Sequence, residues 1–106
     1  MGYEAFASRS VQQLQRHIRA TAADSGRVVL VSHARQRMRL RKVSLNEVLE
    51  VLRKGAIRRM PEPNLTKGSL ECRMEFYVAG RDCAVIVALS DEQPDLLVVT
   101  VWVQNQ

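Results

Sequence analysis

The stretch Leu70–Leu89, LECRMEFYVAGRDCAVIVAL, decides the fold of this 106-residue chain. Its first part, Leu70–Val78, alternates strictly between apolar and polar residues, which predicts a half-buried β-strand. Its last part, Cys83–Leu89, is apolar throughout, as expected of a central strand buried on both faces. The tetrapeptide AGRD between them supplies a turn centred near Gly80. The stretch therefore predicts an antiparallel hairpin.

The register of this hairpin argues against a disulfide bond. A turn centred near Gly80 places Cys72 opposite residues 88–89 and Cys83 opposite residues 77–78. At about 3.3 Å per residue, the two cysteines then lie well beyond the roughly 7 Å limit for a bridge. Free thiols fit a reducing compartment.

Further strands flank the hairpin in the sequence. Leu96–Val103 follows a second turn, and Ala56–Met60 precedes a loop over residues 61–68, where two prolines cannot donate to a strand ladder. With the hairpin, these segments predict a four-stranded antiparallel meander. Arg27–Val31 is a short apolar strand that we expect at one edge of the sheet.

The first 26 residues form an N-terminal helical extension in this interpretation. Ser10 and Gln13 make a capping box, and the helix that follows extends from Val11 to Ala23. No linker or internal repeat follows, so residues 1–106 are expected to form a single domain with residues 27–106 as its core. The sequence leaves open whether the helix docks on this core or meets a partner.

Two more helices are predicted between the first strand and the meander. Ser32 caps a basic helix from His33 to about Arg41, and Ser44 opens a capping box for a helix that ends at Gly55 as its C′ residue. Together they form a hairpin with a basic outer face. This order of helices and strands predicts an α+β fold, with the helices on one face of the sheet.

Positive charge is concentrated around the helix hairpin. The net charge is +5, but the segment from Arg27 to Arg59 holds ten Lys or Arg and two Glu, a net +8, so the rest carries −3. Such a concentration is typical of a surface that binds nucleic acid or an acidic protein. A solvated basic face is the alternative interpretation.

The sequence lacks the motifs that are typical of several classes of function. There is no glycine-rich nucleotide loop, no CxxC and no HExxH, so neither a cofactor nor a metal site is expected. No apolar run approaches the roughly 18 residues that cross a bilayer, and the first residues do not read as a secretory signal. We therefore expect a cytoplasmic protein without membrane contact.

The basic helix begins with the motif S-H-A-x-x-R-M over Ser32–Met38, and V-S-x-x-E-V follows at residues 43–48. This pattern resembles a family of small prokaryotic domains of unknown function that is similar to BrnT toxins and, more distantly, to RelE-type ribonuclease toxins. The resemblance covers about residues 28–103 and implies a helix-plus-sheet fold, RNA cleavage and an antitoxin partner. One feature departs from the RelE-type pattern, because Leu96–Gln106 contains no Lys, Arg or His.

His33 and Arg37 are the candidate catalytic pair. Metal-independent RNA cleavage needs proton transfer at two oxygens and stabilisation of charge on the phosphorane. His33 lies at a positive helix end that attracts phosphate, and Arg37 shares its helix face and can clamp a phosphate with two N–H groups. The alternatives are a structural histidine and a salt bridge from Arg37 to a carboxylate such as that of Glu75.

Further residues are candidates for contact with RNA or a protein partner. Arg73 and Tyr77 share the polar face of one strand, where charge and stacking can hold single-stranded RNA, although solvent-facing cross-strand pairs are the alternative. Arg35 and Lys42 point away from the His33 face and can also act as steering charge. The full set is Arg35, Arg41, Lys42, Arg58, Arg73 and Tyr77.

The sequence supports two functions and leaves open whether the protein is an enzyme. The first is a toxin-type endoribonuclease that cleaves RNA without a metal ion. The alternative is a non-catalytic binding module whose basic hairpin grips an acidic protein or nucleic acid, as a mobile-element or host-directed regulator would. A homodimer through an edge strand, either Ala56–Met60 or Leu96–Val103, is a further arrangement.

Overall fold

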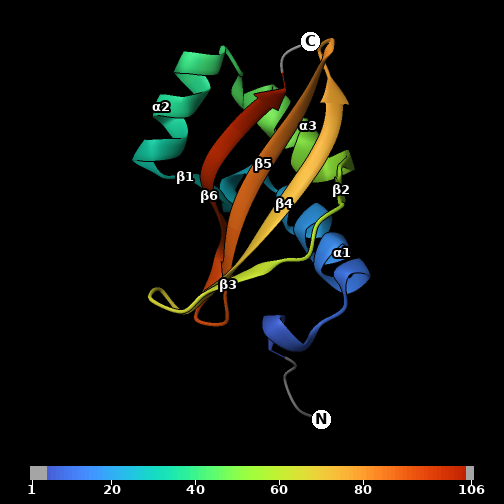
Figure 1. The fold of residues 1–106 in the computed structure, drawn as a ribbon, viewed down its shortest axis with the longest axis vertical. Helices are drawn as coiled ribbons and strands as arrows, with labels where there is room; N and C mark the ends of the chain where they lie inside the picture. The colour runs from blue at the N-terminus through green and yellow to red at the C-terminus, as the bar shows by residue number, and fades with distance from the viewer. Residues whose placement is uncertain (1–4, 105–106) are drawn as a thin grey trace.

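The computed structural model describes residues 5–104 as an α+β fold, as predicted. Its centre is a six-stranded sheet in the order β1-β6-β5-β4-β2, with β3 also paired to β4 (Figure 1). The helices are α1 (Val11–Ala22), α2 (Ser32–Arg41) and α3 (Leu45–Lys54), with short 3-10 turns η1 (Phe6–Ser8) and η2 (Ser25–Arg27). The strands are β1 (Val28–Leu30), β2 (Ala56–Ile57), β3 (Glu62–Asn64), β4 (Ser69–Val78), β5 (Arg81–Ser90) and β6 (Gln93–Gln104).

The predicted meander is present, and the edge strand predicted over Arg27–Val31 is confirmed as β1. β2, β4, β5 and β6 pair antiparallel in chain order, whereas β1 runs parallel to β6 with Val28 opposite Leu96. Because β1 pairs with residues 96–98, this part of β6 is not the exposed edge predicted for a dimer. β2 covers only Ala56–Ile57 and is shorter than the predicted strand Ala56–Met60.

The segment predicted as a loop over residues 61–68 contains a strand. β3 pairs antiparallel with β4, with Pro63 opposite Leu70. A proline is compatible with this position because β3 has a partner on one side only, so its missing N–H need not break a ladder. The prediction was wrong because it excluded proline from any strand, including one at the edge of a sheet.

The β4–β5 hairpin has a tighter turn than predicted. Only Ala79 and Gly80 lie in the turn, and both have positive φ angles, 53° and 79°. Two positive φ angles are typical of a type I′ turn, whose twist matches that of the strands. The register therefore moves by one residue, so that Cys72 lies opposite Val87 rather than residues 88–89. Cys72 and Cys83 are buried free thiols.

The hydrophobic core lies on one face of the sheet. α1 and α3 cover this face, behind the sheet in Figure 1, while α2 stands beside β6. The alternation predicted for β4 places Leu70, Cys72 and Met74 in the core, where they are at most 9% exposed. The opposite face carries no helix in this view and is called the open face below.

The N-terminal helix docks on the core. Leu14, Ile18 and Ala22 of α1 are at most 2% exposed and belong to the same apolar cluster as the sheet residues. Polar contacts add to this packing: Arg19 donates to the carbonyl of Gly55 at 2.7 Å, and Arg53 donates to the carbonyl of Ala22 at 2.7 Å. α1 is therefore a structural part of the fold, which decides between the two roles that the sequence left open.

The capping boxes at Ser10 and Ser44 form as predicted, but α2 begins differently. Val31 is its N-cap residue, because its carbonyl accepts the first helical hydrogen bond from the N–H of Arg35 at 3.0 Å, and its apolar side chain cannot cap the helix. Ser32 is therefore the first helical residue and not the predicted cap. The apolar residue at the cap position leaves the first N–H groups of α2 without a side-chain acceptor.

Gly55 ends α3 for a reason other than the predicted left-handed C′ turn. Its backbone is extended, with φ −76° and ψ −179°. A Cβ atom at this position would lie 2.4 Å from the carbonyl oxygen of Val51 and 2.8 Å from that of Glu75. Glycine is thus required because α3 and β4 approach each other closely here, and not because of a positive φ.

Candidate functional site

The open face carries a groove of about 240 Å³. Its form follows from the register, because Ala84 of β5 lies between Glu75 of β4 and Trp102 of β6 in the same cross-strand row. The short side chain of Ala84 leaves a hollow between the longer side chains on either side. This open-face groove includes Arg58, Arg73, Tyr77, Asp82, Ala84 and Trp102 among its lining residues.

Two aromatic rings are exposed at the groove. The side chain of Tyr77 is 55% exposed and that of Trp102 is 46% exposed. The guanidinium carbon of Arg41, from the last turn of α2, lies 4.4 Å from the centroid of the Trp102 ring. A cation at this distance is attracted by the ring quadrupole. α2 and the groove are therefore joined through Arg41 and Trp102.

The charges in the groove are only partly neutralised. Nε of Arg73 lies 3.3 Å from Oε2 of Glu75, and both side chains are 27% exposed. Among residues 5–104, neither Arg58 nor Asp82 takes part in an ion pair. Within the described part of the chain, the groove thus presents one cation and one carboxylate without an ion-pair partner, and two exposed rings.

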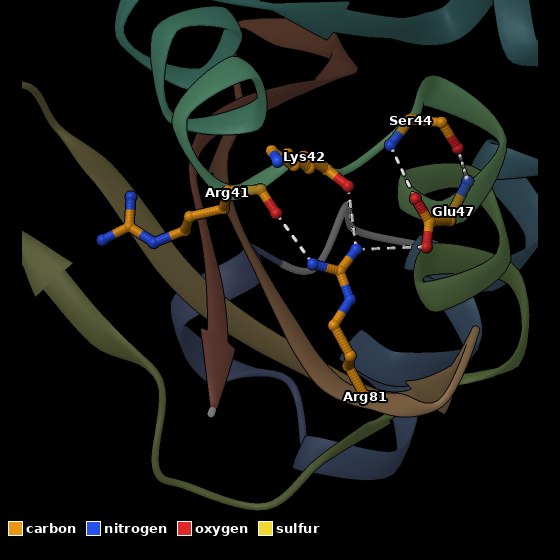
Figure 2. Close-up of polar contacts among 5 residues, drawn as sticks. All are labelled: Arg41, Lys42, Ser44, Glu47 and Arg81. Atoms are coloured by element: carbon orange, nitrogen blue, oxygen red, sulfur yellow. Dashed lines mark hydrogen bonds and ion pairs between the residues drawn. The ribbon is translucent and has the colours of Figure 1, made fainter. Parts of the chain in front are cut away.

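Arg81 fixes the end of α2 (Figure 2). Its Nη1 donates to the carbonyl of Arg41 at 2.7 Å and its Nη2 to the carbonyl of Lys42 at 2.9 Å. Nη2 also lies 3.3 Å from Oε2 of Glu47. Lys42 has a left-handed backbone with φ 55°, so the helix stops at a point where carbonyls need outside donors. Arg81 supplies those donors and holds Arg41 beside Trp102.

The capping box of α3 positions the Glu47 carboxylate for its contact with Arg81. The backbone N–H of Ser44 donates to its Oε1 at 2.7 Å, and Ser44 Oγ accepts from the backbone N–H of Glu47 at 3.1 Å (Figure 2). The pKa of Glu47 lies below its ordinary value, mainly because of the Ser44 N–H, with a further contribution from Arg81. Glu47 therefore remains ionised and links α3 to the Arg81 clamp at the end of α2.

His33 and Arg37 contact each other but do not line the groove. Nε of Arg37 donates to Nε2 of His33 at 3.4 Å, so this contact requires a neutral imidazole. The salt bridge from Arg37 to Glu75, raised as an alternative, is absent because the partner of Glu75 is Arg73. His33, Arg37 and Arg41 share one helix face at spacings of four residues.

The predicted binding residues divide between two surfaces. Arg58, Arg73 and Tyr77 line the open-face groove, and Arg41 borders it through Trp102. Arg35 and Lys42, together with Arg39, line a shallow depression between α2 and α3, whose floor includes Met38 and Val43. We call this second surface the basic depression. The structure thus brings four of the six residues together and places two elsewhere.

Neither cysteine is a reactive thiol, and residues 5–104 hold no candidate metal cluster. Burial raises the pKa of Cys72 to about 12 and also raises the pKa of Cys83, so neither thiol is ionised near neutral pH. No group of three or more His, Cys, Asp or Glu in this part of the chain could hold a metal ion. None of its helices has the length and apolarity needed to span a bilayer.

Residues 30–103 match the sequence profile of a family described as a domain of unknown function (DUF4258). This chain belongs to the DUF4258 family. No curated protein and no solved structure matches it. The DUF4258 segment runs from the end of β1 into β6, so it includes α2, the Arg81 clamp and every groove-lining residue except Gln104, but not α1.

Sequence reasoning missed several groove residues of the DUF4258 segment. Trp102 is absent from the predicted binding residues, and Asp82 belongs to the tetrapeptide AGRD that was predicted as a turn. The alternation of β6 signals that Trp102 and Thr100 share a face, but only the cross-strand register places that face beside Tyr77. Arg81 was missed as the clamp on α2 because its partners lie about 40 residues away in the sequence.

Proposed function

We propose that this protein is a BrnT/RelE-like endoribonuclease that binds single-stranded RNA on the open face of its sheet and cleaves it without a metal ion. One observation carries the proposal: a groove on the open face combines arginines with two exposed aromatic rings. Single-stranded RNA offers phosphates and unstacked bases, and such a groove suits both.

Binding is divided between charge and stacking. Arg58, which has no ion-pair partner among residues 5–104, neutralises a phosphate, and Arg73 adds charge where Glu75 leaves it available. Tyr77 and Trp102 stack on bases, a contact worth roughly 1–3 kcal/mol per base. The phosphate contacts make affinity fall with rising salt.

Cleavage is assigned to the pair on α2. His33 takes the proton of the 2′-hydroxyl as this oxygen attacks the phosphorus, and returns it to the 5′-oxygen as the P–O5′ bond breaks, leaving a 2′,3′-cyclic phosphate. Arg37 stabilises charge on the phosphorane. His33 and Arg41 are eight residues apart, which is about 12 Å along the helix. An RNA strand that leaves the groove past Trp102 and Arg41 would therefore follow the helix face on which Arg37 and His33 lie.

A non-catalytic binding module is the second candidate. Two observations favour it: His33 and Arg37 lie outside the groove lining, and the chain has no basic residue from Leu96 onward. In this case the groove binds RNA without cleaving it, or the basic depression at Arg35, Arg39 and Lys42 grips an acidic protein. An acidic antitoxin would be such a partner for the enzyme as well.

The test is cleavage of a labelled single-stranded RNA by purified protein in the presence of EDTA. We expect cleavage at sites that become resistant when the 2′-hydroxyl is replaced by hydrogen, because this hydroxyl is the attacking group. A His33→Ala/Arg37→Ala protein should bind this RNA but not cleave it. An Arg58→Ala/Tyr77→Ala protein should lose binding and cleavage together.

An Arg35→Ala/Arg39→Ala protein is the control, because it removes two guanidinium groups from the other surface of α2, whereas the catalytic variant removes one. It should retain most cleavage. Binding without cleavage by the wild-type protein would support the binding module instead. Failure to bind any single-stranded RNA at low salt would contradict both candidates on the open face.

A further inference from the structure

The open-face groove has the dimensions of a site for one base. Glu75 and Trp102 flank Ala84 in one cross-strand row, so their strands are two strand spacings apart, about 10 Å. The methyl group of Ala84 forms the floor of this interval. A planar ring can enter between the longer side chains, and its edge then meets the polar groups of the neighbouring row.

Trp102 lies in a position that suits stacking with a base. The guanidinium of Arg41 covers its ring at 4.4 Å, and the backbone of Arg41 is fixed by the Arg81 clamp at 2.7 Å. The indole still lines the groove and is 46% exposed. A ring covered on one side by a cation from a fixed backbone offers its remaining surface to a base.

Asp82 is the unexpected member of the groove. A carboxylate repels phosphate, yet Asp82 lines the groove and makes no ion pair among residues 5–104. In the cross-strand register it lies between Tyr77 and Gln104, one row from Ala84 and Trp102. Its two oxygens only accept hydrogen bonds, so a ligand that suits this position must present donors.

Among the RNA bases, guanine fits this requirement best. Its N1–H and N2 amino group are adjacent donors on one edge, and the two oxygens of a carboxylate can accept from both. Adenine and cytosine place an acceptor beside their amino group, and uracil has a single N–H between two carbonyls. Bases splayed from single-stranded RNA are read along this same edge.

We propose that the open-face groove binds a guanine base, with the ring against Trp102 above Ala84 and its N1–H and N2 amino group donating to Asp82. This inference rests on the proposed binding of single-stranded RNA to the open face and adds the base that is selected. It assigns Asp82 as the residue that determines specificity.

The experiment measures affinity by fluorescence anisotropy with labelled 2′-O-methyl pentanucleotides, which lack the nucleophilic hydroxyl and are not cleaved. The central base is guanine, hypoxanthine, adenine, cytosine or uracil, and the flanking bases are uracil. We expect the guanine ligand to bind about tenfold more tightly than the adenine ligand, as one bidentate base contact provides. Hypoxanthine, which lacks the N2 amino group, should lie between them.

Asp82→Asn should abolish the preference for guanine, because an amide presents one acceptor and one donor in place of two acceptors. Glu92→Gln is the matched control, since Glu92 is exposed outside the groove and the charge change is the same. The control should keep the preference. Equal affinity of the wild-type protein for all five ligands, or a preference that survives in Asp82→Asn, would overturn the assignment while leaving RNA binding intact. Absence of binding to every ligand would overturn the proposed function together with this inference.

Discussion

His17 lies half-buried on α1, with its ring centroid 4.9 Å from that of Phe6. Its pKa is below the ordinary value of 6.5, first because burial penalises the charged ring and then because Arg9 and Arg27 repel it. The unfolded chain therefore binds a proton at His17 more readily than the folded protein does. Stability contributed by the neutral ring is complete above pH 6.5 and declines as the pH falls below it.

We predict that His17→Gln flattens the pH dependence of stability between pH 7 and the lowered pKa of His17, because glutamine has no proton to gain. The measurement is the urea midpoint at several pH values in this range. His33→Gln makes the same substitution at the exposed histidine of α2 and is the control. An unchanged slope in His17→Gln would show that another group carries the dependence.

The face on which a side chain lies was predictable where alternation within a single strand determines it. Arg73 and Tyr77 share the polar face of β4 by alternation alone, and both line the groove. Asp82 and Trp102 join them only through the register between strands, which depends on the length of each turn. A turn of Ala79 and Gly80 differs from the predicted one by a single residue, and that difference changes every cross-strand neighbour.

At the scale of elements, the C-terminus of α2 is the junction on which the site depends. The helix ends at left-handed Lys42, and its last carbonyls accept hydrogen bonds from Arg81 at the start of β5. Glu47 in the first turn of α3 completes the contact (Figure 2). Three elements thus meet at one guanidinium group.

We predict that Arg81→Ala lowers the free energy of unfolding by about 1–2 kcal/mol, because carbonyls at the helix end lose charged donors. It should also change the fluorescence of Trp102, the only tryptophan of the chain, as Arg41 moves from the ring. Urea unfolding and emission spectra measure the two effects. Arg81→Lys keeps the charge without the planar fork and should fall between wild type and alanine.

The control for this variant is Arg16→Ala, which removes an exposed arginine that takes part in no ion pair among residues 5–104. It should leave the urea midpoint and the emission spectrum unchanged. If Arg81→Ala matched it in both measurements, the clamp would not be the group that positions Arg41.

Elements with a strong local signal were predictable, and those defined by distant partners were not. The capping boxes at Ser10 and Ser44 mark helix starts because their partners lie three residues away. β3 forms because it pairs with an edge of β4. No local pattern in this segment with two prolines predicts a strand. β3 is therefore an additional strand that the sequence analysis did not predict, whereas the edge strand predicted over Arg27–Val31 is present as β1.

In the whole molecule, the face of the sheet that packs in the core is separate from the face that carries the groove. α1 and α3 bury one face of the sheet, and the open face keeps the groove accessible (Figure 1). The sequence predicted helices on one face and a concentration of positive charge. It did not predict that this charge divides between the open-face groove and the basic depression, because the division depends on how α2 is placed beside β6.

The central claim is that RNA lies on the open face. The most direct test is a ¹H–¹⁵N NMR titration with an uncleavable 2′-O-methyl oligonucleotide at low salt. We predict shift changes at the single indole N–H signal of Trp102 and at backbone amides of the open-face groove, with α1 and α3 unaffected. Changes confined to the basic depression around Arg35, Arg39 and Lys42, with the indole signal unmoved, would contradict the account.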